Sequence, residues 1–382
     1  MLPNQRALFD IPEDVTYINC AYLSPNLKAQ REMGRWAIDR KMHPWTIEWR
    51  HFYEDVERAR VLFARLINAS NDDIAIVAAT SYGVATASQN LPLKPDQTIV
   101  ALENEHHSTL LEYRRRTAEI GAKLILVPKP KDGDWTSAVL AVIDERTGWV
   151  GVPNCYWTDG GQVDLQKISD RAHQVGAVFM TDVTQSLGAL PIDVKKLKPD
   201  YLMCSAYKWL LGPFGLGFLY VAPHRQEGRP LEQHNYSRAG TETSSNRRTY
   251  TDAYAPGARR YDMGERSHFI HLPIANVGME QLLAWDPAEV ADTIAPLTKR
   301  IAEHAAARQL AVPPEEHRVK HFIGLQFRNG EVPPGLNERL MAERCYVSIR
   351  GSSLRMSPHV YNNLSEIDRF FDVFDRVAAG KH

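Results

Sequence analysis

The stretch that decides the fold runs from 178 to 221 and has the sequence VFMTDVTQSLGALPIDVKKLKPDYLMCSAYKWLLGPFGLGFLYV. Apolar runs occur at 177–181, which begins one residue before the stretch, and at 201–204 and 216–221, each about as long as a β-strand. These runs are almost continuously apolar, which is typical of strands that are buried on both faces of a sheet. Glycines and polar residues between the runs predict turns. We therefore expect three neighbouring strands of a buried sheet here.

Upstream of this stretch the same pattern repeats. Further strand-length apolar runs occur at 74–78, 98–102, 123–127 and 147–152. Segments between the runs, such as 165–175, have the apolar spacing of helices. Strands that alternate with helices predict an α/β fold with a mostly parallel, seven-stranded sheet covered by helices.

The flanking regions predict a second unit. A helix is expected over 52–67, because its apolar residues recur every three or four positions. Downstream, helical spacing returns at 287–310 and 365–379, with candidate strands at 320–327 and 345–350. We expect a large domain over 70–270, a smaller α/β domain over 271–382, and an N-terminal segment 1–69 that packs with the smaller domain.

Composition excludes several classes of protein. The chain has 382 residues, and 45 basic side chains nearly balance 46 acidic ones, so there is no overall basic field for nucleic acid. No apolar run approaches the roughly 20 residues that span a bilayer, and the N-terminus lacks the apolar core of a secretory signal. The four scattered cysteines predict neither a disulfide framework nor a metal site. We expect a cytoplasmic enzyme without a metal.

Two chemical groups meet at the ends of the predicted strands. Asp182 closes one strand, and Lys208 follows the end of the next. Open α/β sheets place their ligands at the carboxyl ends of strands. Pyridoxal phosphate (PLP) requires a lysine for its Schiff base and an acid that keeps its ring nitrogen protonated. A solvated lysine beside a capping aspartate is the alternative interpretation of the same two residues.

Two segments of this stretch resemble the class-V aminotransferases, a family that includes the cysteine desulfurases and selenocysteine lyases. The segments are DVTQSLGALPID at 182–193 and SAYKWLLGPFG at 205–215. The resemblance implies the PLP-dependent transferase fold type I, with Lys208 as the Schiff-base lysine and Asp182 as the partner of the ring nitrogen. It also implies that Gln185 contacts the phenolic oxygen and that Ser205 contacts the phosphate. Tyr207 stands where the family often has histidine and keeps a donor for the phosphate.

Three other positions agree with this resemblance. Thr80 and Ser81 open a predicted helix after a strand, where free N–H groups and hydroxyls can hold a phosphate; a simple N-cap is the alternative. In the segment Glu-His-His at 105–107, the family stacks the first histidine on the cofactor, which implies His106 as a catalytic residue. Asn154 ends a strand where the family has an asparagine that contacts the phenolic oxygen, although such an asparagine is also a common turn residue.

The C-terminal region supplies candidate substrate-binding residues. The family's carboxylate-binding arginine precedes a pattern that resembles SPHVYN at 357–362, which implies Arg355. Its planar guanidinium suits two parallel bonds to a carboxylate. Arg350 is the second candidate, and a surface arginine is the alternative for both. Ala21, Tyr22 and the loop 233–256 are candidates for lining the substrate pocket.

The sequence departs from the family at two points. Desulfurases carry a nucleophilic cysteine on a loop before this arginine, whereas the chain has only Gly-Ser-Ser-Leu between Arg350 and Arg355. Cys345 begins a predicted strand and is expected to be a buried, small apolar residue. Glu265 stands where a threonine of the partner subunit would reach the phosphate. A carboxylate would repel that phosphate, so Arg266 or Ser267 would take its place or the segment would point elsewhere.

These observations predict a homodimeric PLP enzyme, with its active site near the subunit interface, that acts on an amino acid or similar amine. Transamination is the main hypothesis. A C–S lyase, another β-eliminating enzyme or an epimerase of the same fold is the alternative, and a non-catalytic PLP-fold binding protein is the second. A nicotinamide dehydrogenase is excluded because no strand is followed by GxGxxG.

Overall fold

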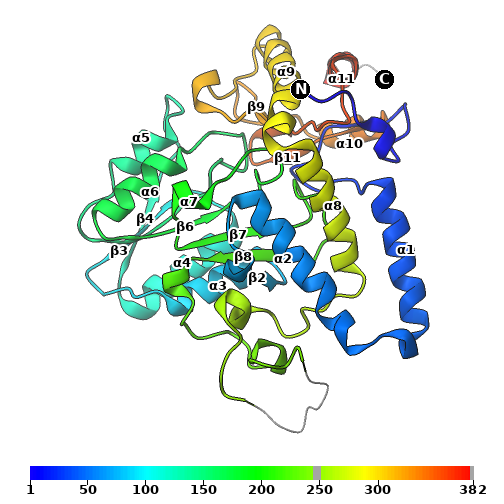
Figure 1. Cartoon of the computed structure of the whole chain (residues 1–382). Helices are drawn as coiled ribbons and strands as arrows, with labels where there is room; N and C mark the ends of the chain where they lie inside the picture. Colours follow the sequence, from blue (N-terminus) through cyan, green and yellow to red (C-terminus); the bar gives the residue numbers. More distant parts are fainter. Residues whose placement is uncertain (244–250, 379–382) are drawn as a thin grey trace.

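The computed structural model describes residues 1–243 and 251–378 (Figure 1). Its centre is a seven-stranded sheet with the strand order β2-β8-β7-β6-β5-β3-β4. β8 is antiparallel to both of its neighbours, and all other adjacent strands are parallel. The strands are β2 (Ile74–Val77), β3 (Thr98–Leu102), β4 (Lys123–Val127), β5 (Thr147–Gly151), β6 (Val178–Asp182), β7 (Tyr201–Ser205) and β8 (Gly217–Val221). The predicted α/β fold with a mostly parallel sheet is confirmed.

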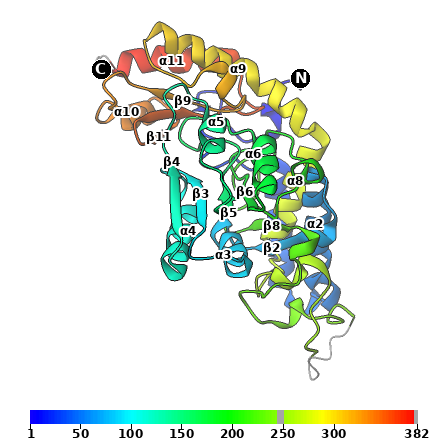
Figure 2. The same cartoon turned by 90° about the vertical axis from the view of Figure 1, so that its left-hand side faces the viewer.

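Helices cover both faces of this sheet (Figures 1 and 2). Along β2, Ile74 and Ile76 pack on one face, and Ala75 and Val77 pack on the other. This alternation explains the continuous apolar runs, because every strand position then meets a hydrophobic layer. The first face is covered by α2 (Glu54–Ile67), α5 (Trp135–Leu140), α6 (Leu165–Gln174) and α8 (His271–Trp285), and the second by α3 (Thr80–Asn90) and α4 (His107–Ile120).

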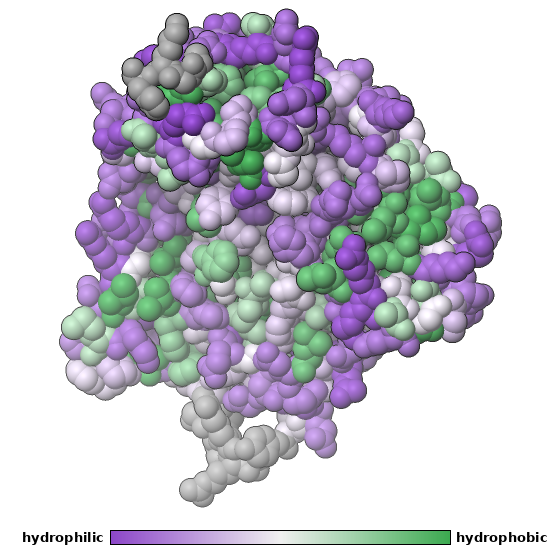
Figure 3. Space-filling model, turned by 180° about the vertical axis from the view of Figure 1, so that it is seen from behind, coloured by the Kyte–Doolittle hydropathy of each residue, from purple (hydrophilic) through white to green (hydrophobic). Residues whose placement is uncertain are grey.

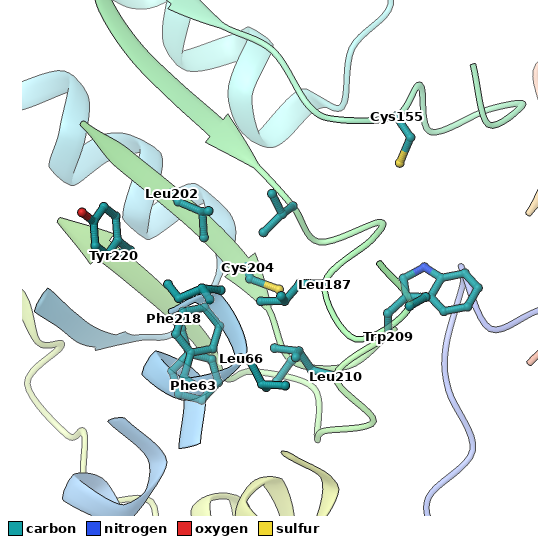
Figure 4. Close-up of a cluster of buried hydrophobic side chains, with 14 of the residues drawn as sticks. Phe63, Leu66, Cys155, Leu187, Leu202, Cys204, Trp209, Leu210, Phe218 and Tyr220 are labelled. Atoms are coloured by element: carbon teal, nitrogen blue, oxygen red, sulfur yellow. The ribbon is translucent and has the colours of Figure 1, made fainter. Parts of the chain in front are cut away.

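Helix α2 shows how the first of these layers is built. Its side chains Phe63 and Leu66 pack on the sheet, as Figure 4 shows, and the ring of Phe63 stacks on that of Phe218 in β8 with centroids 4.4 Å apart. Acidic residues occupy the first turn of the helix, and Asn68 ends it in the left-handed conformation. The structure thus confirms the predicted helix, which begins two residues later than expected.

The smaller unit lies beside the upper end of this sheet in Figure 1. A three-stranded antiparallel sheet, in the order β11-β12-β9, shares one hydrophobic cluster with three helices of this unit, α9, α10 and α11. The elements are β9 (Ile323–Gln326), β11 (Ser348–Arg350), β12 (Ser353–Met356), α9 (Pro287–Ala307), α10 (Leu336–Ala342) and α11 (Leu364–Ala378). The single strand expected at 345–350 is interrupted at Val347, because β10 (Cys345–Tyr346) pairs with β1 (Thr16–Tyr17) whereas β11 pairs with β12.

The N-terminal segment contacts both units. β1 joins the smaller unit through β10, while α1 (Lys28–Met42) and α2 pack against α8. The long polar segment between β8 and α8 contains three short 3-10 helices at Pro223–Arg225, Asn235–Ser237 and Gly257–Tyr261, and residues 244–250 of the predicted pocket loop lie outside the described residues. In the part of the chain that the structure describes, no helix has the length and apolar character needed to cross a membrane.

Candidate active site

Two adjoining cavities surround Lys208 at the carboxyl ends of β6 and β7. The inner cavity has a volume of about 240 Å³, the outer cavity about 480 Å³, and Lys208, His106 and Gln185 line both. Also lining the inner cavity are Ala79, Thr80, Glu105, Ser108, Pro153, Cys155, Trp157, Asp182, Thr184, Ser205, Tyr207 and Phe214. Also lining the outer cavity are Ala21, Tyr22, Leu23, His107, Trp157, Tyr207, Phe214, Arg350 and Arg355. The topology therefore brings most of the predicted site residues together.

Asp182 and Lys208 provide opposite charges within the inner cavity. Asp182 Oδ1 accepts hydrogen bonds from the backbone N–H of Thr184 at 2.9 Å and from its hydroxyl at 2.5 Å. Burial raises the pKa of Asp182, and these two bonds act against that rise. The amine of Lys208 is also buried, and this burial, helped by the charge of Arg355, lowers its pKa to about 8. The unprotonated form, which a nucleophile or base requires, is therefore far more populated near neutral pH than for an exposed lysine.

Three hydroxyl groups form a cradle at the start of α3. Thr80 Oγ1 lies 2.9 Å from Ser205 Oγ and 3.1 Å from Thr184 Oγ1, which in turn accepts the N–H of Ser205 at 3.0 Å. The N-terminus of a helix favours an anion, so this cradle suits a phosphate group. Ser81 is exposed and does not line the cavity, because the next residue of a helix is rotated by about 100°. Thr184, which the sequence analysis missed, links the cradle to Asp182.

Gln185 is held in one orientation by groups from two other segments. Its Oε1 accepts the indole N–H of Trp209 at 3.3 Å, and its Nε2 donates to the carbonyl of Ala21 at 3.2 Å. The second N–H of this amide therefore remains to donate into the cavity. Asn154, by contrast, lines a separate cavity between α2 and α6. Its neighbours Pro153 and Cys155 line the inner cavity with Lys208.

His106 caps α4 and lines both cavities. Its Nδ1 accepts the backbone N–H of Ser108 at 3.4 Å, so the neutral ring carries its proton on Nε2. Burial, together with the charge of Lys208, lowers its pKa to about 4. The ring is therefore neutral at pH 7, which suits stacking on a flat ring and hydrogen-bond donation from Nε2.

Glu105 is a site residue that sequence reasoning missed. Its Oε1 accepts the N–H of His106 at 2.6 Å, whereas its buried Oε2 has no hydrogen-bond partner among the described residues. Burial raises the pKa of Glu105 to about 8, and the nearby charge of Asp182 contributes to the rise. The carboxyl group is therefore neutral at pH 7. Its place in the Glu-His-His segment was the available signal, but an acid beside a turn is usually exposed.

Arg355 and Arg350 enter the outer cavity from the smaller unit. Arg355 is only 1% exposed, its Nη1 donates to the carbonyl of Trp157 at 2.7 Å, and its Nε has no hydrogen-bond partner among the described residues. Burial and the charge of Arg350 lower the pKa of Arg355 to about 9. A buried guanidinium with an unused N–H is suited to bind a carboxylate.

At the positions that depart from the family, the cysteines, Arg266 and Ser267 are buried or form contacts with other residues of the same chain. All four cysteines are buried, and Cys345 on β10 is packed in the hydrophobic cluster of the smaller unit, as expected for a packing residue. Cys155 lines the inner cavity, but burial raises the pKa of its thiol well above its usual range. Arg266 bonds to Asp262 and to the carbonyl of Phe52, which also accepts the hydroxyl of Ser267.

The donor set of the inner cavity fits PLP. An acid, an amine, a hydroxyl cradle at a helix N-terminus and a fixed amide donor correspond to the ring nitrogen, aldehyde, phosphate and phenolic oxygen of that molecule. Among the described residues, the unpartnered Oε2 of Glu105 in this cavity and the unpartnered Nε–H of Arg355 in the outer one also indicate a polar occupant.

Comparisons with known proteins agree with this geometry. A model of the class-V aminotransferase family matches residues 38–255. A Bacillus subtilis protein named "Uncharacterized aminotransferase YcbU" is 23% identical over 338 residues, which are 85% of this chain and 84% of that protein. A probable cysteine desulfurase of Pyrococcus abyssi is 33% identical over 168 residues, or 43% of this chain and 42% of that protein.

Solved structures share the whole fold. The apo cysteine desulfurase of Thermococcus onnurineus NA1 superposes with a TM-score of 0.83 at 21% identity, covering 98% of this chain and 97% of that one. The cystine C–S lyase C-DES, in complex with its product cysteine persulfide, has a TM-score of 0.83 at 17% identity, covering 95% and 98%. The chain belongs to the class-V aminotransferase family and is an enzyme whose cofactor is pyridoxal 5′-phosphate.

Proposed function

We propose that this chain is a lyase that cleaves the bond between Cβ and sulfur in a sulfur-containing α-amino acid by β-elimination. The balanced reaction converts RS–CH₂–CH(NH₃⁺)–COO⁻ and water into RSH, pyruvate and ammonium. The carrying observation is that the buried amine of Lys208 lines two adjoining cavities, one shared with Asp182 and one shared with Arg355, while every cysteine is buried. Relatives named as cysteine desulfurases support a sulfur amino acid as substrate.

The cofactor, when bound, withdraws electrons from the α-carbon of the amino acid. Under this proposal Lys208 holds the cofactor and moves the α-proton, and Asp182 keeps the ring nitrogen protonated. Gln185 donates to the phenolic oxygen. The hydroxyls of Thr80 and Ser205, with their neighbours Tyr207 and Thr184, hold the phosphate. Asn154 and Ser81 do not line this cavity, so no cofactor contact is assigned to them.

The neutral His106 would lie against the ring and donate a hydrogen bond from its Nε2–H to the leaving sulfur. The proton that the sulfur takes up would be the α-proton held on the amine of Lys208. The α-carboxylate is bound by Arg355, which fixes the α-carbon beside the amine of Lys208. A persulfide route would require a thiolate that reaches the substrate. Because the pKa of the buried Cys155 thiol is raised, we assign no covalent role to it.

Transamination is the second candidate function. It is supported by the Bacillus relative, which is named an aminotransferase and matches this chain over 85% of its length. The two reactions share the removal of the α-proton by the lysine. They differ in their later steps, because a transaminase needs a keto-acid acceptor and releases no ammonia.

The products separate the two candidates. The purified enzyme, loaded with PLP, is incubated with L-cystine or S-alkyl-L-cysteines, with and without a keto acid. Elimination is expected to yield pyruvate and ammonia in equal amounts without the keto acid. If turnover occurs only in the presence of the keto acid and releases no ammonia, the lyase proposal is refuted and the enzyme is a transaminase. Borohydride reduction and peptide mass mapping test the cofactor link, and a label on a lysine other than Lys208 would refute the assignment.

We also propose that two copies associate, with the active sites near their interface. Large hydrophobic side chains are exposed along α1 and the turn after it, including Met42 at 67% and Trp45 at 78%. The rear face in Figure 3 likewise has hydrophobic areas between hydrophilic ones, the largest on the side where β3 and β4 lie. If light scattering gives the mass of a single chain, the proposed dimer is refuted.

The cytoplasmic location stays a prediction, which cell fractionation would test.

A further inference from the structure

A short hairpin presents two arginines on one face. β11 and β12 are antiparallel, with Ser348 opposite Arg355 and Ser353 opposite Arg350. Side chains two positions apart on a strand lie on the same face, so Arg350 shares the face of Ser348 and of its cross-strand partner Arg355. The two positions are therefore diagonal neighbours, and both side chains line the outer cavity.

Arg350 lies nearer the mouth of this cavity and lacks an anionic partner. Its side chain donates to the carbonyl of Ile349 at 2.9 Å, and its guanidinium lies 5.2 Å from the ring centroid of Tyr22, which is half exposed. Within the described ranges, no salt bridge includes Arg350. The contact with Tyr22 orients the guanidinium without neutralising its charge.

The outer cavity as a whole has an excess of positive charge. Lys208, Arg350 and Arg355 line it, and none of the described residues that line it is an aspartate or glutamate. The positive charges of both arginines contribute to the lowered pKa of Lys208, because they disfavour a third positive charge in the same cavity. Under the proposed function, one α-carboxylate offsets Arg355 and leaves Arg350 unpaired.

We propose that Arg350 binds a second acidic group on the side chain of the substrate. The substrate is then a sulfur amino acid whose leaving group carries its own carboxylate or a similar anion. This inference rests on the proposed function for the bond that is cleaved. The binding of a second anion by Arg350 does not depend on that function and can be measured separately.

The activity test uses a nearly isosteric pair of substrates. S-(2-carboxyethyl)-L-cysteine and S-(2-carbamoylethyl)-L-cysteine differ in one charged group. A hydrogen bond between charged partners changes an equilibrium by about ten- to a hundredfold, so the acid is expected to have a kcat/KM at least about tenfold higher than the amide. Arg350→Gln is expected to bring this ratio close to one, and Arg350→Lys to keep part of it.

The matched control is Arg328→Gln. Arg328 is exposed on the loop after β9 and lines neither cavity, so the acid-to-amide ratio is expected to stay at its original value. Loss of the ratio in this control would attribute the preference to overall charge and overturn the inference. Equal kcat/KM for acid and amide in the unmodified enzyme would overturn it as well, while leaving the lyase activity in place.

A binding test distinguishes the two proposals. Calorimetry of the PLP-loaded enzyme with glutarate and with its monoamide, glutaramate, measures the second anion site without catalysis. Glutarate is expected to bind at least about tenfold more tightly, and Arg350→Gln is expected to remove the difference. If this result is obtained but no substrate undergoes elimination, the proposed lyase function fails and the anion site stands. Equal binding of the two compounds overturns the anion site.

Discussion

Replacing Glu105 with glutamine tests whether this buried carboxyl group is neutral in the folded protein. The substitution keeps the shape of the side chain and the carbonyl oxygen that accepts the N–H of His106. It removes only the ability to ionise. The oxygen that becomes the amide nitrogen has no hydrogen-bond partner among the described residues, so no existing bond is lost there.

The size of the effect comes from the pKa of Glu105, which burial raises from an ordinary value of 4.5 to about 8. Between these values the folded protein retains a proton that the unfolded chain releases. The stability that this group contributes is therefore complete below pH 4.5 and is lost as the pH rises to 8. Each pH unit in this window costs about 1.4 kcal/mol, so about 2 to 3 kcal/mol is lost between pH 5.5 and 7.5.

The assay is urea denaturation of the cofactor-free protein at pH 5.5 and 7.5, because a bound cofactor would add charge beside Glu105. The stability of Glu105→Gln, relative to the unmodified protein, is expected to rise by about 2 to 3 kcal/mol over this interval. Histidines with lowered pKa values titrate in both proteins and cancel in this difference. Glu103→Gln is the matched control, since Glu103 is exposed two positions upstream. A relative stability that is the same at both pH values would refute a neutral Glu105.

Four other predictions address the site and the fold. Asp182→Ala is expected to retain the cofactor absorbance but to lower kcat by at least about a hundredfold, and Asp182→Glu is expected to be milder; normal turnover of the alanine variant would remove Asp182 from the mechanism. Arg355→Ala should lower kcat/KM for a carboxylate-bearing amino acid by at least about tenfold, with partial rescue by lysine, and full activity would end its assignment as the carboxylate-binding residue. Cys345→Ala should keep the main activity, whereas its loss with an unchanged circular dichroism spectrum would restore a persulfide mechanism. Gly188→Ala should destabilise the fold by at least about 2 kcal/mol in denaturant unfolding, because its Cβ would lie 2.1 Å from the carbonyl oxygen of Trp209 at a backbone φ of +106°; an unchanged stability would contradict this packing.

Much of the sheet could be predicted because its signal is local. A strand buried on both faces must be apolar at successive positions, so each strand appears in the sequence as a continuous run. The placement of Asp182 and Lys208 at one edge could also be predicted, since parallel strands end on the same side. The break of the last candidate strand at Val347 could not, because it depends on β1, more than 300 residues away in the sequence.

The sequence by itself therefore determined the layered α/β fold, the acid and lysine at the strand ends and the hydroxyls at a helix start, because each depends on residues close together in the chain. Tertiary structure alone decided the environment of each group. Burial makes Glu105 a neutral acid, and Asn154 lines a different cavity from Lys208. The packing of the smaller unit on the sheet brings Arg350 and Arg355 into one cavity with Lys208. Burial and charge proximity are sums over neighbours that are distant in sequence, so no local pattern can encode them.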